Sequence, residues 1–286
     1  MKEDPFKLRD HILALKLRDV GYLSHSGLSL PYDAPLSEAR RLVRERGVRT
    51  VSVVDPSTQR LLGILTRGDL LAVTSSKTEA TVGSLSYEPP LTLSEDDVVG
   101  ESLRRMLSYD LWEAPVVDSG SRFRGLFTFG DFISFFVSKD PEYLRGLVVN
   151  DFMTRDPVVA YQDDHIARIW RKMIELRYAG LPVVDANHRL VGIITQYDLL
   201  AKGYTRIHLE SESGPSKGPR VRDAMTYSVV FAHPFSTMLD VATIMSKRNI
   251  GRVPIVESRD SMKLVGIVDR EDVVRAVLGE GRERED

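Results

Sequence analysis

One apolar pattern occurs four times in this chain, and the repetition constrains the fold more than any other feature. Each copy is an apolar run that contains glycine, then a four-residue signature, then a second apolar run. The copies are LLGILTRGDLL (61–71), FRGLFTFGDFI (123–133), LVGIITQYDLL (190–200) and LVGIVDREDVV (264–274). Each copy follows a second short strand pattern, namely VSVVD (51–55), APVVD (114–118), LPVVD (181–185) and VPIVE (253–257).

The upstream half of each copy keeps the same register. Met153 precedes Pro182 by 29 residues, and the same interval separates Met225 from Pro254 and Leu23 from Ser52. A stretch with helical periodicity lies within each interval. Each unit of about 55 residues is therefore predicted to run strand, helix, strand, turn, strand, helix. A sheet that small leaves one face uncovered, so we expect the units to pack in pairs.

The repeats divide the chain almost completely. Residues 6–19 are predicted to form an additional helix before the first repeat. The predicted boundaries are an N-terminal helix or extension at 1–16, repeats at 17–74, 82–137, 148–203 and 221–278, a linker at 204–220 and a charged tail at 279–286.

The two motifs, h-P-V-V-D and G-h-h-T-x-x-D-h, resemble those of cystathionine-β-synthase-type (CBS) domains, over four tandem copies. The resemblance implies an α/β fold in which each repeat has a three-stranded sheet and two helices. It also implies that repeats pair into two Bateman modules that pack as a disc. This arrangement is similar to the gamma subunit of AMP-activated protein kinase and to freestanding four-repeat CBS proteins. Clefts in such modules bind AMP, ADP, ATP or S-adenosylmethionine.

The signature places a hydroxyl and a carboxylate one helical turn apart at a helix N-terminus, as in Thr66 and Asp69. Free backbone N–H groups and the helix dipole attract phosphate there, and an ionised carboxylate can accept two hydrogen bonds from a ribose diol. The resemblance assigns ribose binding to Asp69, Asp131, Asp198 and Asp272, and phosphate binding to Thr66, Thr128 and Thr195. The fourth repeat has Asp269 in place of threonine, so its site is expected to be empty or to prefer an adenosine without phosphate. The same pairs can equally be helix caps that need no ligand.

Basic residues are distributed unevenly among the copies. The resemblance assigns phosphate binding to Arg49 and Arg252, before the second strand, and to Arg67 and Arg270, inside the signature. At the positions of Arg49 and Arg252 the other repeats have Trp112, Glu113, Ala179 and Gly180. Repeats one and four are therefore better suited to an anion, either separately or through one shared ligand. Taken singly, each arginine can also be a solvated surface charge.

The adenine slot is assigned by register in repeat three. The resemblance places the base between Thr154, Pro157 and Val158 on one side and Gly180, Leu181 and Pro182 on the other. Aliphatic residues at these positions are also what a core requires.

Composition argues against most other functions. The chain has no cysteine, its six histidines show no metal-ligand spacing, and no catalytic constellation or nucleotide-binding glycine loop is present. The net charge of −2 gives no pull toward nucleic acid or membrane, and we expect a cytoplasmic protein without metal or cofactor. Arginine exceeds lysine while asparagine and glutamine are scarce, which hints at a thermophilic source.

We therefore predict a non-catalytic regulatory protein that binds AMP, ADP or ATP and signals to an effector protein in trans through a conformational change. Two alternatives stay open: a sensor of S-adenosylmethionine or methylthioadenosine, and a scaffold without a small-molecule ligand. Homodimerisation also stays open.

Overall fold

The fold is described from a computed structural model, over residues 5–21, 28–72, 80–139, 141–204 and 218–281. Repeat one contains a three-stranded sheet in which β1 (Ser29–Pro31) is parallel to β2 (Thr50–Val54), and β3 (Leu61–Thr66) is antiparallel to β2. Helix α3 (Leu36–Arg46) connects β1 to β2 and ends at Gly47, whose left-handed φ of 67° favours glycine. Helix α4 (Arg67–Ala72) follows β3 directly.

Repeats two and three share this plan. Repeat four shares the hairpin and the helices, but a single parallel bridge between Ala232 and Ile255 stands in place of its first strand, and the third strand of its sheet is β7 (Thr154–Arg155) of repeat three. Repeat two has β4 (Leu93–Ser94), α6 (Val99–Ser108), β5 (Glu113–Val117), β6 (Phe123–Thr128) and α7 (Phe129–Ser138). Repeat three has β8 (Ala160–Tyr161), α9 (Ile166–Glu175), β9 (Gly180–Val184), β10 (Leu190–Thr195) and α10 (Gln196–Ala201). Repeat four has α13 (Met238–Arg248), β11 (Arg252–Val256), β12 (Leu264–Asp269) and α14 (Arg270–Leu278). The connecting elements are α5 (Val82–Leu85), α8 (Glu142–Arg145), η2 (Val149–Asp151), β7 (Thr154–Arg155) and α12 (Val221–Ala224).

The first residues of a repeat lie against the hairpin of its partner repeat. The backbone pairs that show this are Ile64–Tyr87, Ile193–Thr226 and Ile267–Thr154. A glycine in the apolar run permits the close approach: a Cβ at Gly266 would lie 2.9 Å from the Thr154 carbonyl oxygen, and a Cβ at Gly192 would lie 3.0 Å from the Thr226 oxygen. The glycine of the repeated motif therefore serves the pairing of repeats.

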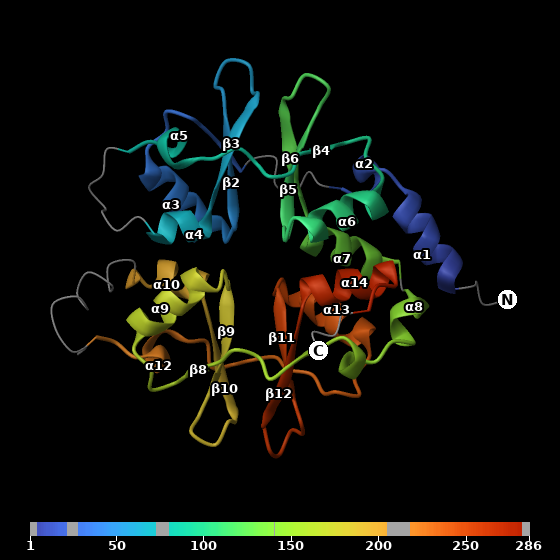
Figure 1. The fold of residues 1–286 in the computed structure, drawn as a ribbon, viewed down its shortest axis with the longest axis vertical. Helices are drawn as coiled ribbons and strands as arrows, with labels where there is room; N and C mark the ends of the chain where they lie inside the picture. The colour runs from blue at the N-terminus through green and yellow to red at the C-terminus, as the bar shows by residue number, and fades with distance from the viewer. Residues whose placement is uncertain (1–4, 22–27, 73–79, 140, 205–217, 282–286) are drawn as a thin grey trace.

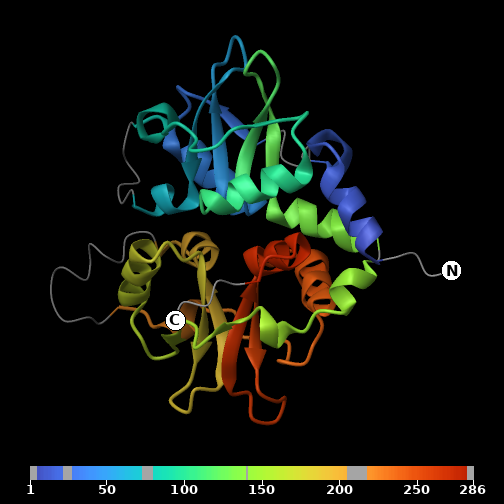
Figure 2. The same cartoon turned by 45° about the vertical axis from the view of Figure 1, so that its right-hand side comes forward.

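These backbone contacts join repeats one and two into a first module and repeats three and four into a second. The hairpin tips add backbone hydrogen bonds, for example from Leu61 N to Ser121 O (3.0 Å) and from Leu190 N to Met262 O (2.8 Å). The modules face each other through helices, with α4 toward α10 and α7 toward α13 and α14 (Figure 1). Figure 2 shows the same two layers turned by 45°. The predicted α/β fold of four repeats that pack in pairs is confirmed.

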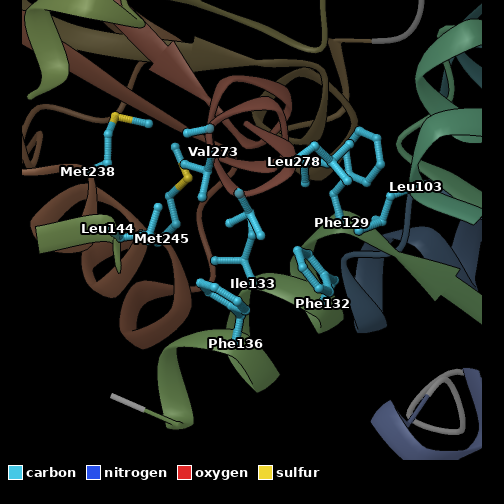
Figure 3. Close-up of a cluster of buried hydrophobic side chains, with 14 of the residues drawn as sticks. Leu103, Phe129, Phe132, Ile133, Phe136, Leu144, Met238, Met245, Val273 and Leu278 are labelled. Atoms are coloured by element: carbon cyan, nitrogen blue, oxygen red, sulfur yellow. The ribbon is translucent and has the colours of Figure 1, made fainter. Parts of the chain in front are cut away.

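The hydrophobic cores run across the two modules. The larger one joins repeat two to repeat four, where phenylalanines of α7 pack with side chains of α13 and α14 (Figure 3). Its residues include Phe129, Phe132, Ile133, Phe136, Met238, Met245, Val273 and Leu278. A second core joins repeat one to repeat three through residues such as Leu65, Leu70, Trp170 and Leu199. Burial of apolar surface therefore holds the modules together.

The N-terminal segment forms two helices instead of the single one predicted over 6–19. Helix α1 (Pro5–Ala14) ends before Lys16, which has an extended backbone and forms an antiparallel bridge with Val98, and α2 (Leu17–Val20) follows. Ile12 is buried in the core of repeats two and four. The helix is interrupted because Lys16 pairs with repeat two. No helix in the described ranges is long and apolar enough to span a bilayer.

Three sequence predictions fall wholly or largely outside the described residues: the register at Leu23, most of the linker at 204–220 and most of the charged tail at 279–286.

Candidate functional site

Each signature begins a helix with a reciprocal cap. Thr66 Oγ1 donates to Asp69 Oδ2 (2.5 Å), and the Asp69 backbone N–H donates to Thr66 Oγ1 (3.3 Å). The equivalent distances are 2.8 and 3.0 Å for Thr128–Asp131, and 2.5 and 3.1 Å for Thr195–Asp198. The capping role left open by the sequence is thus present in these three signatures.

The fourth signature caps its helix with a carboxylate. Asp269 Oδ1 accepts hydrogen bonds from the backbone N–H groups of Glu271 (2.9 Å) and Asp272 (3.3 Å). Asp272 is almost fully buried, at 2% exposure, and accepts from the Asp269 N–H at 2.9 Å. In the sheet, Asp269 lies directly opposite Arg252. The departure from threonine therefore places a negative charge beside one of the predicted phosphate-binding cations.

Capping leaves part of the signature carboxylates accessible to other partners. The cap of Asp198 uses Oδ2, while Oδ1 lies 3.5 Å from Thr226 Oγ1, at the start of repeat four. Asp69 lies near Tyr87, at the start of repeat two; burial raises the pKa of Tyr87, and the Asp69 carboxylate raises it further. In both cases the carboxylate faces the first residues of the partner repeat. In Asp198 the cap and the contact with the partner repeat use different oxygens, so capping does not exclude a second role for this carboxylate.

Three repeats meet at the ring of Trp112. The guanidinium carbon of Arg49, from repeat one, lies 4.5 Å from the ring centroid, and that of Arg252, from repeat four, lies 4.6 Å from it. Burial lowers the pKa of Arg252 to about 10; the nearby Asp269 opposes this shift, and the charge of Arg49 adds to it. The structure thus brings together the two arginines that the sequence placed before the second strand.

Arg67, the first signature arginine, is a buried neighbour of Arg49. It is only 7% exposed, and its Nη2 donates to the carbonyl oxygens of Gly47 (2.5 Å) and Val48 (2.7 Å), which follow α3. Its guanidinium carbon is 5.6 Å from the ring centroid of Tyr197, in repeat three. Burial and the neighbouring Arg49 lower its pKa to about 10.

Arg270 reaches from repeat four to repeat two. Its Nη2 donates to Asn249 Oδ1 (3.2 Å), and its guanidinium lies against Gly130, where a Cβ would come within 2.8 Å of the guanidinium carbon. Burial lowers the pKa of Arg270, and Arg49 contributes to the shift. Arg49 is therefore the common repulsive neighbour of the other three arginines.

Trp112 and Glu113 take roles that the sequence did not assign. The Trp112 ring makes cation–π contacts with the guanidinium groups of Arg49 and Arg252. Glu113 Oε1 accepts a hydrogen bond from Thr50 Oγ1 (2.5 Å). Their only signal in the sequence was position, because they occupy in repeat two the places of the basic residues in repeats one and four. We call Arg49, Arg67, Arg252 and Arg270, with Trp112 and Glu113, the central arginine cluster.

The central arginine cluster has the chemistry that an anion requires. Guanidinium groups donate paired hydrogen bonds to phosphate or carboxylate, and an anion between them relieves their mutual repulsion. No group of histidine, aspartate and glutamate residues in the described ranges is arranged to hold a metal ion.

Four of the six predicted adenine residues lie on two different sheets, and Pro157 and Val158 lie between strands. Thr154 lies in β7, which pairs with β12 next to the fourth signature, whereas Gly180, Leu181 and Pro182 lie in β9. Pro157 is buried and Val158 is half-buried, and Leu181 belongs to the core of repeats one and three. The structure thus brings Thr154 to the strand that leads to Asp269, and it gives Leu181 a packing role.

The chain belongs to the CBS domain family, whose profile matches residues 18–76, 82–138, 149–203 and 221–279. It is 24% identical to protein MJ1225 of Methanocaldococcus jannaschii over 261 residues, which cover 84% of this chain and 91% of that protein. The crystal structure of MJ1225, described as a candidate archaeal homologue of g-AMPK, superposes with a TM-score of 0.78 at 22% identity, over 91% of this chain and 99% of that one. The archaeal origin of this relative fits the thermophilic bias of the composition.

Two crystal structures that match about half of this chain contain adenosine compounds. The chain is 30% identical to CBSX2 of Arabidopsis thaliana over 169 residues, 49% of this chain and 67% of CBSX2. A crystal structure of CBSX2 in complex with AMP matches 47% of this chain and 98% of that one, at 34% identity and a TM-score of 0.40. The CBS domain pair of protein MJ0100, in complex with 5′-methylthioadenosine and S-adenosyl-L-methionine, matches 46% of this chain and 96% of that one, at 32% identity and a TM-score of 0.38.

Proposed function

We propose that this chain is a non-catalytic regulatory protein that binds an adenine nucleotide between its repeats, with the phosphates at the central arginine cluster. The observation that carries the proposal is the convergence of Arg49 and Arg252 on Trp112. Neither guanidinium forms a hydrogen bond or an ion pair with another residue in the described part of the chain. A phosphate group would supply the acceptor atoms that these donors lack.

The adenosine part of the ligand is inferred from the signatures. Asp198 Oδ1 and Asp69 face the start of a partner repeat, where a ribose diol could donate to the carboxylate. This ligand class agrees with the AMP held by CBSX2, a relative at 30% identity. We extend the assignment to the equivalent Asp131 and Asp272.

We infer a regulatory role from the position of the cluster between the two modules. Arg49 belongs to the first module and Arg252 to the second, so one anion would contact both modules. A ligand shifts a conformational equilibrium only by its difference in affinity for the two states. We propose that the nucleotide favours the state in which the modules close on the cluster, and that an effector protein in trans recognises this state.

A second candidate concerns the fourth signature alone. Asp269 puts a carboxylate where the other signatures have a hydroxyl, which disfavours phosphate at that helix N-terminus. A ligand with a neutral or cationic 5′ substituent, such as methylthioadenosine or S-adenosylmethionine, would suit this site. Binding of these compounds without any binding of nucleotides would replace the first proposal.

The test is calorimetric titration with AMP, ADP, ATP and S-adenosylmethionine. The protein is first unfolded and refolded, to remove any ligand carried from the host. Trp112 gives an optical readout, because Trp170, the other of the two tryptophans, is buried in a separate core and can be replaced by phenylalanine. We expect saturable binding of at least one phosphorylated adenosine and a change in Trp112 emission. Absence of binding by all four compounds would refute the proposal and favour a scaffold.

A matched pair of variants separates ligand contacts from caps. Thr237 and Asp240 form the same reciprocal cap (2.8 and 3.1 Å) at the start of α13, which is not a signature helix. Asp198→Asn should weaken nucleotide binding, whereas Asp240→Asn should leave it unchanged. If neither variant changes binding and both change stability alike, the signature aspartates are caps only.

A further inference from the structure

In each pair of facing repeats, one signature carries an arginine and the other does not. The signature helices face each other across the disc, α4 of repeat one with α10 of repeat three and α7 of repeat two with α14 of repeat four (Figures 1 and 2). At the second signature position the first pair has Arg67 in α4 and Gln196 in α10, and the second pair has Arg270 in α14 and Phe129 in α7.

The two arginines differ in how they meet the facing signature. The guanidinium of Arg270 packs on Gly130, in the first turn of α7, with Asp131 close enough to stabilise its charge. The guanidinium of Arg67 lies 5.6 Å from the Tyr197 ring, with Asp198 next in sequence and electrostatically coupled to it. Arg67, however, also donates to the carbonyl oxygens of Gly47 and Val48 in its own repeat, so only Arg270 packs directly on the signature of the other module.

The glycines of the third signature position show how specific this contact is. A Cβ at Gly130 would lie 2.8 Å from the guanidinium carbon of Arg270 and 2.9 Å from its Nη1. A Cβ at the equivalent Gly68 would meet only its own signature's Thr66 Oγ1, at 3.5 Å. Absence of a side chain is therefore needed for the packing of a neighbour at Gly130 and not at Gly68.

We propose that Arg270 completes the ligand site of the facing repeat two, the site of Asp131. This inference rests on the proposed function. It makes that site a joint product of both modules: the first module supplies the N-terminus of α7 and the carboxylate, and the second supplies the cation. A nucleotide bound there would link repeat two to repeat four. The hydrophobic cores pair the repeats in the same way.

The first test uses the two glycines. Gly130→Ala should displace the flexible end of Arg270 at little cost in stability, while Gly68→Ala displaces no neighbouring side chain. We expect Gly130→Ala to weaken one nucleotide site about tenfold in calorimetry, with AMP, ADP and ATP as probes, and Gly68→Ala to leave binding unchanged. Equal effects of the two variants would overturn the proposal.

The second test asks which aspartate shares a site with Arg270. Arg270→Met and Asp131→Asn should remove the same site, so the double variant should bind like the weaker single variant. Arg270→Met with Asp272→Asn should instead lose two sites. The reverse pattern would show that Arg270 shares a site with Asp272 of its own signature, and it would refute the proposal. Arg275→Met, on the same helix and paired with Glu271 at 2.9 Å, controls for the loss of one positive charge.

The outcomes separate this inference from the proposed function. If the wild-type protein binds none of the nucleotides, the proposed function fails, and the ligand role of Arg270 fails with it. Double-mutant cycles on the free energy of unfolding, without ligand, still decide the placement of Arg270. Coupling to Asp131 that exceeds coupling to Asp272 supports the cross-module contact, and the opposite result refutes it.

Discussion

Removing the charge of Arg49 should weaken nucleotide binding while leaving the stability of the fold nearly unchanged. Arg49 and Arg252 both lie over Trp112, so their guanidinium carbons are at most about 9 Å apart. At an effective dielectric constant of about 20, two unit charges at that distance repel by about 2 kcal/mol. Arg49→Met keeps most of the side-chain stem and removes this repulsion, together with a smaller repulsion toward Arg67 and Arg270.

The loss of the contact with Trp112 offsets part of this gain. A cation–π interaction at a half-exposed site contributes about 0.5–1 kcal/mol. We therefore expect the free energy of unfolding of Arg49→Met, without ligand, to lie within about 1 kcal/mol of the wild-type value or above it. Nucleotide affinity should fall about 10- to 100-fold, because a hydrogen bond to a charged group contributes about 1.5–3 kcal/mol.

Urea unfolding at low and high sodium chloride measures the stability side. Salt screens the repulsion, so the wild-type protein should gain more stability from salt than Arg49→Met does. Arg41→Met, on the exposed face of α3, is the control for charge removal in the same repeat. A loss of more than about 2 kcal/mol in Arg49→Met would show that Arg49 is a structural residue, since typical substitutions cost about 1 kcal/mol. Unchanged nucleotide affinity would refute the role of the cluster.

Three further predictions concern the scaffold. Gly266→Val should lower the free energy of unfolding by about 1–3 kcal/mol, because its side chain would meet Thr154, and urea unfolding measures this. Ile12→Ala should cost about 2–5 kcal/mol in the same assay, since Ile12 is 1% exposed in the core. The backbone N–H of Arg122 holds the pKa of Asp118 below its ordinary value of 3.8. This carboxylate therefore stabilises the fold above pH 3.8 and loses that effect as the pH falls through its lower folded-state pKa. Asp118→Asn should remove this part of the acid dependence, and NMR titration of Asp118 checks the pKa itself.

The sequence predicted the repeat because its signals are local. The aspartate that ends each V-V-D run shows this: Asp55, Asp118 and Asp185 each accept hydrogen bonds from backbone N–H groups in the hairpin turn that follows. The glycine, the turn and the helix cap recur at fixed spacing, and each has a short-range physical cause. Strand order and helix positions follow from them.

The backbone contacts between the start of one repeat and the hairpin of its partner could not be predicted in the same way. They depend on β7, a strand of two residues, and on single bridges such as Ile193–Thr226, which are too short to leave a periodic pattern. The contact of Arg270 with Gly130 joins residues distant in sequence. The sequence singled out the arginines by their position in the motif, but their neighbours depend on which repeats face each other.

The four copies share a backbone plan and differ in charge at its centre, and this difference bears on how binding could become a signal. Cores that cross the modules hold the disc closed, while the cluster's positive charges oppose closure. A repulsion of about 2 kcal/mol between one pair of arginines corresponds to a factor of about 30 in a conformational equilibrium. An anion that neutralises the pair would shift the balance by up to that factor toward closure. A symmetric disc with a neutral centre would lack this response, so under the proposed function the uneven distribution of arginine among the repeats is what makes the equilibrium sensitive to an anion.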